Sequence, residues 1–363
     1  MTATRTSAKR VRSVLDDAPQ IAQYLGLEAR KLARLLRTGR IGAAVGSVAE
    51  LATGRNPYYA FRLEDRRYQA VSVGDHELVV DTTDAGISRT LLAYGVHEYR
   101  SSTVFERELE RLTATVDGPV CVLEVGANIG YFCTMEAGIL GGRARIHAVE
   151  PIPSNVALLE HNLERNGYAH LADVDRLAFG DEQRTVEMQL STHSNQHQVR
   201  ADSTAEDGVS ARDGVSSAAG GTSSTPTLDD AERETISVEQ TTGNRYLADC
   251  DIEPASINVV RFDVEGYESA VLEGLTDVLE APGPTVVYAE LHPLDLSPES
   301  KAAVVERFAA NGFEVVSAVR TDAAAGVSDA RRWHGLECDV ESFDDLRRAM
   351  AESDHSIELI ARK

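Results

Sequence analysis

Acidic side chains and one histidine gather at the ends of two apolar segments in the second half of the chain. The first segment ends on Asp263, with Glu265 two residues later, and the second ends on Glu290, with His292 two residues later. If both segments are strands of an open α/β sheet, their carboxyl ends lie at the edge where ligands bind. Because carboxylates and imidazoles often accept protons from substrates, the pattern predicts an acid–base site at this edge.

Other roles stay open for the same residues. Acids are favourable at helix N-termini, so Asp263 or Glu265 can instead cap the helix that we expect to begin near Gly266. His292 precedes a proline and can be an ordinary loop residue. Clustered Asp263, Glu265 and Glu290 can also bind a divalent cation, since oxygen ligands suit magnesium.

A glycine-containing turn follows an earlier apolar strand, 121–125, and contains Gly126 and Gly130. A second strand begins some fifteen residues after the turn and ends on Glu150. Strand, glycine turn, helix, strand and acid form the βαβ unit that holds an adenosine-containing cofactor. We expect Gly126 to permit the sharp turn, Gly130 to let the helix sit close to the cofactor, and Glu150 to accept hydrogen bonds from ribose hydroxyls.

The turn alone does not distinguish a nicotinamide site from an S-adenosylmethionine (SAM) site. A pyrophosphate needs close backbone approach at a helix N-terminus, and the third glycine of the dinucleotide fingerprint is absent here. SAM has no phosphate and carries a sulfonium cation, so a carboxylate near the turn is useful. Glu124 stands directly ahead of the glycines and is placed to meet that cation, although it can also be a surface or capping glutamate.

Four segments, in this order, resemble the FkbM-type SAM-dependent methyltransferases. They are LEVGANIGY at 123–131, VEPIPSN at 149–155, VRFDVEGYE at 260–268 and VYAE at 287–290. The D-x-E-G-x-E pattern in the third segment is the most specific of them. Two residues depart from the family pattern: Glu124 replaces the usual aspartate, and Arg261 stands where a lysine is common, which can alter the edge of the pocket.

The resemblance implies methyl transfer from SAM, an in-line displacement that needs a well-placed nucleophile and a base that takes its proton. The catalytic candidates are Asp263, Glu265, Glu290 and His292. The cofactor-binding candidates are Glu124, Gly126, Ala127, Asn128, Gly130, Glu150, Asp181 and Glu98. Asp181 is expected to accept from the adenine amino group, and Glu98 matches a family position that folds over the cofactor. The resemblance does not demand a metal, so we predict none.

Hydrophobic periodicity predicts the elements that position these residues. Strands are expected at about 120–125, 145–149, 174–179, 257–263, 285–290, 313–319 and 356–361, and helices at about 129–140, 154–166, 267–279, 298–311 and 343–352. The last two strands are expected to pair antiparallel. The predicted fold is therefore α/β and Rossmann-like, with a seven-stranded, mostly parallel sheet and helices on both of its faces.

Two segments precede this methyltransferase domain, which we place at 119–363: a basic helical extension, 1–56, and a lead-in, 57–118. Alternation of apolar and polar residues in the lead-in predicts a β-hairpin that turns at Gly74 and Asp75. Residues 1–62, which comprise the extension and the start of the lead-in, carry a net charge of +7, and this leaves −29 for the remainder.

A helix within the extension is predicted to be amphipathic. Its apolar face is expected to contain Ile21, Leu25, Ala29, Leu32 and Leu36, and its basic face Arg30, Lys31, Arg34 and Arg37. Such a helix can lie on an anionic membrane surface. We favour the other interpretation, in which it packs on the catalytic domain and shows its charges to water.

Residues 192–234 interrupt the predicted sheet with a low-complexity tract that has almost no large apolar residues. Such a tract cannot bury enough surface to offset its ordering entropy, so we expect disorder. It joins two strand-like runs, 184–190 and 235–240, which should form a hairpin beside the third core strand. A lid over the substrate is possible in principle, but a solvated insertion fits the composition better.

Composition narrows the partners and the compartment. The chain has 58 acidic and 36 basic residues, and only four of the bases are lysines. Dense carboxylates with scarce lysine suit a cytoplasm of high salt, and they disfavour a nucleic-acid partner. The four cysteines, Cys121, Cys133, Cys250 and Cys338, form no C-x-x-C pair and are expected to be buried thiols in a reducing compartment. No signal peptide or spanning segment is evident, so we expect a cytoplasmic protein, at most peripheral at the membrane.

The leading hypothesis is a SAM-dependent O-methyltransferase that acts on a hydroxyl, or a carboxyl, of a sugar, glycan precursor or secondary metabolite, lipid-linked glycans included. A second hypothesis is a catalytically inactive binding or scaffold module that retains the fold. A third, an NAD-linked oxidoreductase, would need the missing third glycine and a second nucleotide-binding half. The oligomeric state is not predicted.

Overall fold

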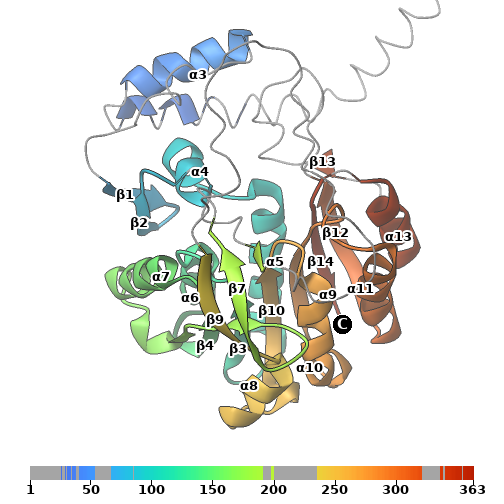
Figure 1. Cartoon of the computed structure of the whole chain (residues 1–363). Coiled ribbons are helices and arrows are strands. Elements are labelled where there is room, and N and C mark those ends of the chain that lie inside the picture. The colour runs from blue at the N-terminus through green and yellow to red at the C-terminus, as the bar shows by residue number, and fades with distance from the viewer. Residues whose placement is uncertain are drawn as a thin grey trace, which may run out of the picture.

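The structure is a computed structural model that describes residues 26, 29, 31–33, 35–37, 41–53, 67–84, 86–190, 198–199, 235–320, 336–337, 340–353 and 355–363. Its largest sheet has eight strands in the order β13-β12-β14-β11-β10-β3-β4-β5 (Figure 1). Their bounds are β3 Val120–Val125, β4 Ala144–Val149, β5 Ala172–Asp175, β10 Ile257–Asp263, β11 Val286–Leu291, β12 Glu314–Arg320, β13 Leu336–Glu337 and β14 Ile357–Arg362. The five strands from β11 to β5 are parallel, and β14 runs antiparallel to both β11 and β12.

The predicted mostly parallel sheet and its antiparallel final pair are therefore confirmed. Two boundaries are corrected. The single strand predicted at 174–179 is two strands, because the chain leaves the large sheet after Asp175 and Ala178–Phe179 (β6) joins a second sheet. The helix predicted at 267–279 is broken at Leu275 into α9 (Glu268–Gly274) and α10 (Thr276–Glu280). The short strand β13 was not predicted.

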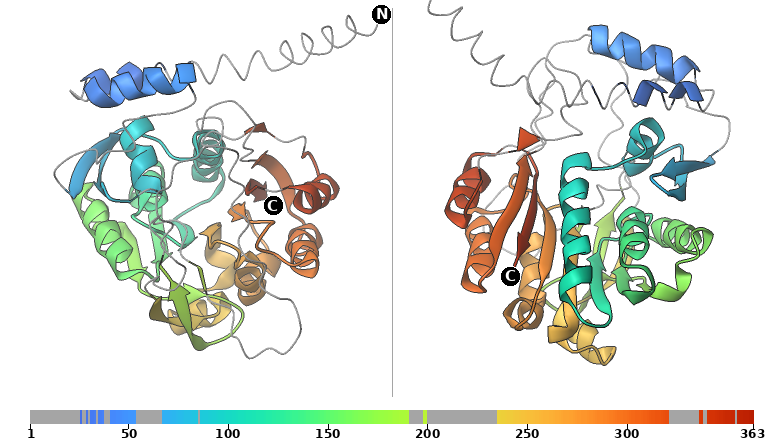
Figure 2. Two further views of the ribbon diagram at one scale, coloured as in Figure 1. Left: turned by 45° about the horizontal axis from the view of Figure 1, so that its top comes forward. Right: turned by 180° about the vertical axis from the view of Figure 1, so that it is seen from behind.

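Helices cover both faces of the sheet (Figure 2). One layer contains α5 (Tyr99–Thr115), α6 (Tyr131–Leu140) and α7 (Pro153–Arg165); the other contains α8 (Gly243–Asp249), α9, α10, α11 (Pro298–Ala310) and α13 (Phe343–Glu352). Successive strand residues point to opposite faces, so Val122 packs in the first layer and Leu123 in the second. Short 3-10 helices lie at Gly141–Arg143, Ala169–Leu171 and Pro254–Ser256.

The hairpin of β1 (Tyr68–Val73) and β2 (His76–Asp81) turns at Gly74 and Asp75, as predicted, and α4 (Ile87–Tyr94) follows it. Two asparagines on α7 attach the hairpin to the core. Asn162 accepts a hydrogen bond from Val79 N (2.7 Å) and donates to Val79 O (3.1 Å). Asn166 binds the backbone of Glu77 in the same way, at 3.1 and 2.9 Å. Residues four apart on a helix face therefore match residues two apart on an edge strand.

The second sheet has the order β6-β9-β7-β8, with β7 at Arg184–Gln189, β8 at Gln198–Val199 and β9 at Thr235–Thr241. The predicted hairpin is confirmed, because β7 and β9 pair antiparallel along their length. The low-complexity insertion predicted at 192–234 lies outside the described residues, apart from Gln198 and Val199, which pair with β7.

The N-terminal extension contributes described residues between 26 and 37, most of them helical, and α3 (Ile41–Thr53). The predicted amphipathic orientation is wrong at two described positions. Lys31 is 1% exposed, donates to the Tyr94 hydroxyl (3.2 Å) and lies over its ring, whereas Leu36 is 53% exposed. Among the described residues, no helix is long and apolar enough to cross a bilayer. Cys250 is exposed rather than buried as predicted, and Cys338 lies outside the described residues.

Candidate active site

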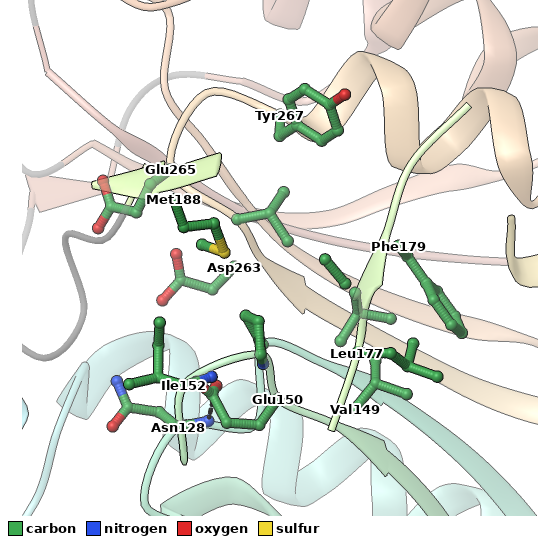
Figure 3. Close-up of a pocket in the computed structure, with 15 residues that line it drawn as sticks. Asn128, Val149, Glu150, Ile152, Leu177, Phe179, Met188, Asp263, Glu265 and Tyr267 are labelled. Atoms are coloured by element: carbon green, nitrogen blue, oxygen red, sulfur yellow. Dashed lines mark hydrogen bonds between the residues drawn. The ribbon is translucent and has the colours of Figure 1, made fainter. Parts of the chain in front are cut away.

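A cleft opens at the carboxyl ends of β3, β4 and β10 (Figure 3). Its position at the carboxyl edge of parallel strands is where α/β sheets bind ligands. It is lined by Val125, Gly126, Asn128, Val149, Glu150, Pro151, Ile152, Leu177, Ala178, Phe179, Met188, Asp263, Val264, Glu265 and Tyr267. One wall is apolar and comes from the β5–β6 segment and from Met188 on β7. The carboxylates of Glu150, Asp263 and Glu265 supply the charge.

The glycine turn joins the two halves of this cleft. Gly126 has φ +80°, and a Cβ placed there would lie 2.3 Å from the carbonyl oxygen of Asp263, so only glycine lets the turn pass the end of β10. The role predicted for Gly130 is corrected. Its φ is +83°, and its Cβ would lie 2.5 Å from Leu159 Cδ1, so its close approach is to helix α7 and not to the cleft. Ala127 is buried and, like Gly130, does not line the cleft.

Glu150 lies at the end of β4, where the sequence predicted it, and is 4% exposed. Its Oε2 accepts from Asn128 N (2.8 Å), and its Oε1 accepts from Ile152 N (3.0 Å) and Asn155 Nδ2 (3.2 Å). These bonds fix the carboxylate against the glycine turn. Burial outweighs them and raises the pKa of Glu150 to about 7.

The four predicted catalytic residues come together at the carboxyl edge. Asp263 and Glu290 are register neighbours on β10 and β11. His292 Nε2 lies 3.3 Å from Glu265 Oε2 and 3.6 Å from Glu290 Oε1. Asp263 and Glu265 line the cleft, whereas Glu290 and His292 lie behind them. Glu265 itself adopts a left-handed backbone, with φ +50°.

Crowding of carboxylates dominates the electrostatics of this cluster. Burial, with the neighbouring Asp263 charge, raises the pKa of Glu290 to about 8. Burial also raises the pKa of Glu265 to about 9, with Asp263 and Glu290 adding to the shift. The imidazole of His292 responds in the opposite sense. Although burial opposes its charge, the surrounding carboxylates raise the pKa of His292 well above its usual value, so it is a cation at neutral pH.

Glu268 is a site residue that the sequence reasoning missed. Its side chain is fully buried, and its Oε1 lies 2.6 Å from His292 Nδ1 while accepting from Gly266 N (2.9 Å). Glu268 therefore orients the imidazole so that Nε2 points at Glu265 and Glu290. The available signal is the final acid of the D-x-E-G-x-E pattern, which is Glu268 itself.

Two predicted cofactor-binding acids lie beneath the cleft and not in it. Glu124 is fully buried, and its Oε1 accepts from Arg261 Nη1 at 2.9 Å, which corrects the prediction that it meets a ligand cation. Arg261 is likewise buried and does not form the pocket edge. Glu98 is 7% exposed, with His97 Nε2 2.8 Å from its Oε1 and the Tyr288 hydroxyl bonded to Oε2. Burial pushes its pKa up, but His97, Arg261 and Tyr288 outweigh it and lower the pKa of Glu98 to about 2.

Asp181 is exposed and does not line the cleft, so the structure does not place its carboxylate where an adenine would sit. The apolar lining residues Ile152, Leu177, Phe179 and Met188 were also missed. In sequence they look like any core residue of a βα unit. The second sheet, in which β9 pairs with both β6 and β7, brings Met188 toward Asp263 (Figure 3).

Two overlapping donor sets within the described residues have the spacing of a cation site. They are Asp263, Glu265 and His292, and Glu98, Asp263 and Glu290, with donor atoms within 4.8 Å of one another in each set. Carboxylate oxygens suit magnesium, and an imidazole suits a transition metal. However, His292 already places a positive charge among three carboxylates. The cluster therefore has an internal counter-ion for part of its charge.

A family profile described as "Methyltransferase FkbM domain" matches residues 124–352, more than half of the chain. The matched region contains the glycine turn, Glu150, the acid cluster and the helices from α6 to α13. The fold is thus that of an α/β methyltransferase with a mostly parallel sheet. The chain belongs to the FkbM family of SAM-dependent methyltransferases, and this membership implies SAM as the methyl donor.

Solved structures with a similar fold are distant in sequence. The FkbM methyltransferase from Methylobacillus flagellatus is 12% identical over 71% of this chain and 47% of its own, with a TM-score of 0.37. An O-methyltransferase from Bacillus cereus in complex with SAH is 12% identical, over 76% of this chain and 86% of its own, with a TM-score of 0.38. A SAM-dependent methyltransferase from Agrobacterium tumefaciens is 9% identical, over 82% and 70%, with a TM-score of 0.38. The chain spans about half the length of the Methylobacillus protein. No curated protein sequence matches it.

The raised pKa of Glu290 predicts a loss of stability with rising pH. An unfolded glutamate loses its proton near pH 4.5, whereas Glu290 keeps it to about pH 8. The folded state therefore binds more protons than the unfolded state between these values. Its stabilisation is complete below pH 4.5 and is lost as pH rises to about 8.

We expect Glu290→Gln to flatten this dependence. The slope of unfolding free energy against pH should become less negative, by up to about 1.4 kcal/mol per pH unit. Urea denaturation at several pH values between 5 and 8 measures it, with Glu280→Gln on the exposed end of α10 as the matched control. Parallel curves for the wild type and Glu290→Gln would contradict the assignment.

Proposed function

We propose that this protein is an O-methyltransferase whose acceptor is a hydroxyl, or a carboxyl, of a sugar, a glycan precursor or another secondary metabolite. One observation carries the proposal. Asp263 lines the cleft at the end of β10, and its Oδ1 is buried without a hydrogen-bond partner among the described residues. A buried acceptor atom of this kind is costly unless a ligand donates to it. An acceptor hydroxyl would supply that donor.

The residues of the cleft fit a SAM molecule. Gly126 provides a turn without a side-chain barrier, Glu150 provides carboxylate oxygens for ribose hydroxyls, and Ile152 and Phe179 provide an apolar wall for a base. When bound, SAM supplies an electrophilic methyl group. Asn128 and Glu150 would hold it by its polar groups, and the hydrogen bonds that already fix Glu150 pre-organise the site.

Asp263 is proposed as the base that takes the proton from the hydroxyl that becomes methylated. Burial raises its pKa, which makes it a better base than an ordinary aspartate, while the nearby Arg261 guanidinium opposes that shift. Glu265 and Glu290 border Asp263 and have pKa values raised to about 9 and about 8. His292 is cationic, so its proposed part is to stabilise these carboxylates when they lose their protons.

The proposed acceptor is uncharged or cationic where it meets the cluster, because the described residues that line the cleft include acids but no Lys, Arg or His. The net charge of −22 also argues against a nucleic-acid partner. We further propose that the protein works in a cytoplasm of high ionic strength. The scarcity of lysine among its bases supports this, since hydrated carboxylates keep a surface soluble when salt screens charge.

Glu150→Ala should weaken SAM binding. The change removes charge-assisted hydrogen bonds to ribose and also frees Asn128 N and Ile152 N from their acceptor. Each bond to a charged group is worth about 1.5–3 kcal/mol, so we expect at least a tenfold rise in Kd. Calorimetric titration with SAM measures it. Asp181→Ala, at an exposed position outside the cleft, should bind as the wild type does; unchanged binding by Glu150→Ala would place the cofactor elsewhere.

Asp263→Asn should lower kcat by about 10²–10⁴-fold, the usual contribution of a general base. The amide keeps the shape but cannot take the proton. SAM affinity should change little if Asp263 acts on the acceptor, so turnover and calorimetric Kd are measured on the same preparation. Wild-type turnover by the variant would reduce Asp263 to a helix-capping residue.

Removal of divalent metals should leave methyl transfer intact. Arg261 and the His292 cation already supply positive charge to Asp263, Glu265 and Glu290. We therefore expect equal turnover before and after dialysis against EDTA, with and without added Mg²⁺. If turnover disappears with EDTA and returns with Mg²⁺, the acid cluster binds a catalytic cation.

A further inference from the structure

The N-terminal extension presents an apolar surface to solvent. Ile41, Val45 and Val48 are 65%, 64% and 51% exposed, and they lie on one side of α3 because they are spaced by four and three residues. Leu36, on the preceding helical segment, is 53% exposed. We call these four side chains the α3 apolar face. Elsewhere among the described residues, Tyr68 and Leu294 are the large apolar side chains with comparable exposure.

This apolar face is not the side by which the extension packs on itself. Leu35 and Ala44 are 2% and 3% exposed and form a small cluster with Leu32 between the two helical segments. Lys31 connects the first segment to Tyr94 of α4. In Figure 1, α3 lies above the hairpin and α4, at the margin of the molecule. One side of α3 is therefore already packed against the preceding helical segment, whereas the α3 apolar face is exposed to solvent.

The charge around this face selects an anionic lipid surface as its partner. Residues 1–62 carry +7, whereas the rest of the chain carries −29, so an anionic membrane attracts this segment and repels the remainder. Exposed Arg37 adjoins Leu36, and Arg40 and Arg55 flank α3 in the sequence. A second copy of the chain would bring one basic segment against another, which disfavours a dimer through the same face. A helix of 13 residues is too short to span a bilayer but suits its interface.

We propose that α3 docks this enzyme on an anionic membrane surface, with Ile41, Val45 and Val48 inserted at the level of the headgroups and the exposed Arg37 near lipid phosphates. The docking face differs from the one predicted from sequence, because Lys31 is buried and Leu36 is exposed. The proposal does not depend on the nature of the methyl acceptor. It concerns where the enzyme resides.

Vesicle flotation of the full chain tests the proposal. Wild-type protein is mixed with phosphatidylglycerol vesicles or phosphatidylcholine vesicles, and the floated fraction is measured. We expect flotation with the anionic vesicles to exceed that with the zwitterionic ones. The variant I41S/V45S/V48S should reduce the anionic floated fraction by about fivefold or more, since it removes most of the apolar insertion. The variant L294S removes an equally exposed apolar side chain from the catalytic body and should float as the wild type does.

Circular dichroism melting of each variant checks that the fold is retained, and light scattering after size exclusion measures its mass. Failure of the wild type to float, or equal flotation of wild type and I41S/V45S/V48S, would overturn the proposal. It would also be overturned by a wild-type dimer that the triple variant dissociates, with no flotation by either. In that case the α3 apolar face is a contact between copies.

Discussion

The site is built around one buried cation. Arg261 is 4% exposed in the middle of the sheet, where Nη1 donates to Glu124 at 2.9 Å and Nη2 lies 3.9 Å from Glu98 and 3.8 Å from Asp263. Its guanidinium lies 3.7 Å from the centre of the Phe132 ring. A planar group with several donors can serve several acids and an aromatic face at once, which a lysine cannot do. Without Arg261, its buried acidic partners would lose their shared counter-ion, and each would have to take up a proton or shift position.

The remaining acids exceed the available positive charge, and this excess shapes the chemistry. Among the residues that the structure describes, the cation close to Glu265 and Glu290 is the imidazolium of His292, which Glu268 holds in place. Their pKa values are consequently raised into the range where a carboxyl exchanges protons near neutral pH. The ion pairs of Arg261 and the acid cluster around His292 therefore belong to one electrostatic network. The shifts around Arg261 are mixed: His97, Arg261 and Tyr288 outweigh burial and lower the pKa of Glu98 to about 2, whereas burial outweighs Arg261 and raises the pKa of Glu124 to about 7.

Peripheral elements are attached to this core by a few specific contacts. The N-terminal hairpin is held on α7 by Asn162 and Asn166, whose side-chain amides pair with its edge strand. The second sheet is joined to the large sheet through β6, which follows β5 in the chain and pairs with β9. Its strand β7 places Met188 in the wall of the cleft. In a fold of this kind, the residues that line the cleft and the N-terminal helices can vary while the glycine turn and the buried ion network stay in place.

The sequence by itself determined the alternation of strands and helices, the glycine turn, and the acids at strand ends, because these follow from local periodicity and from the geometry of parallel strands. It also supported the family assignment through the D-x-E-G-x-E segment. Only the tertiary structure decided which acids reach the cleft. Glu124 and Glu150 both flank the glycine turn, yet one points into the sheet toward Arg261 and the other faces the cofactor cleft. Strand pleat and the hydrogen-bond partners that neighbouring elements supply set those directions, and they are tertiary features that no short motif encodes.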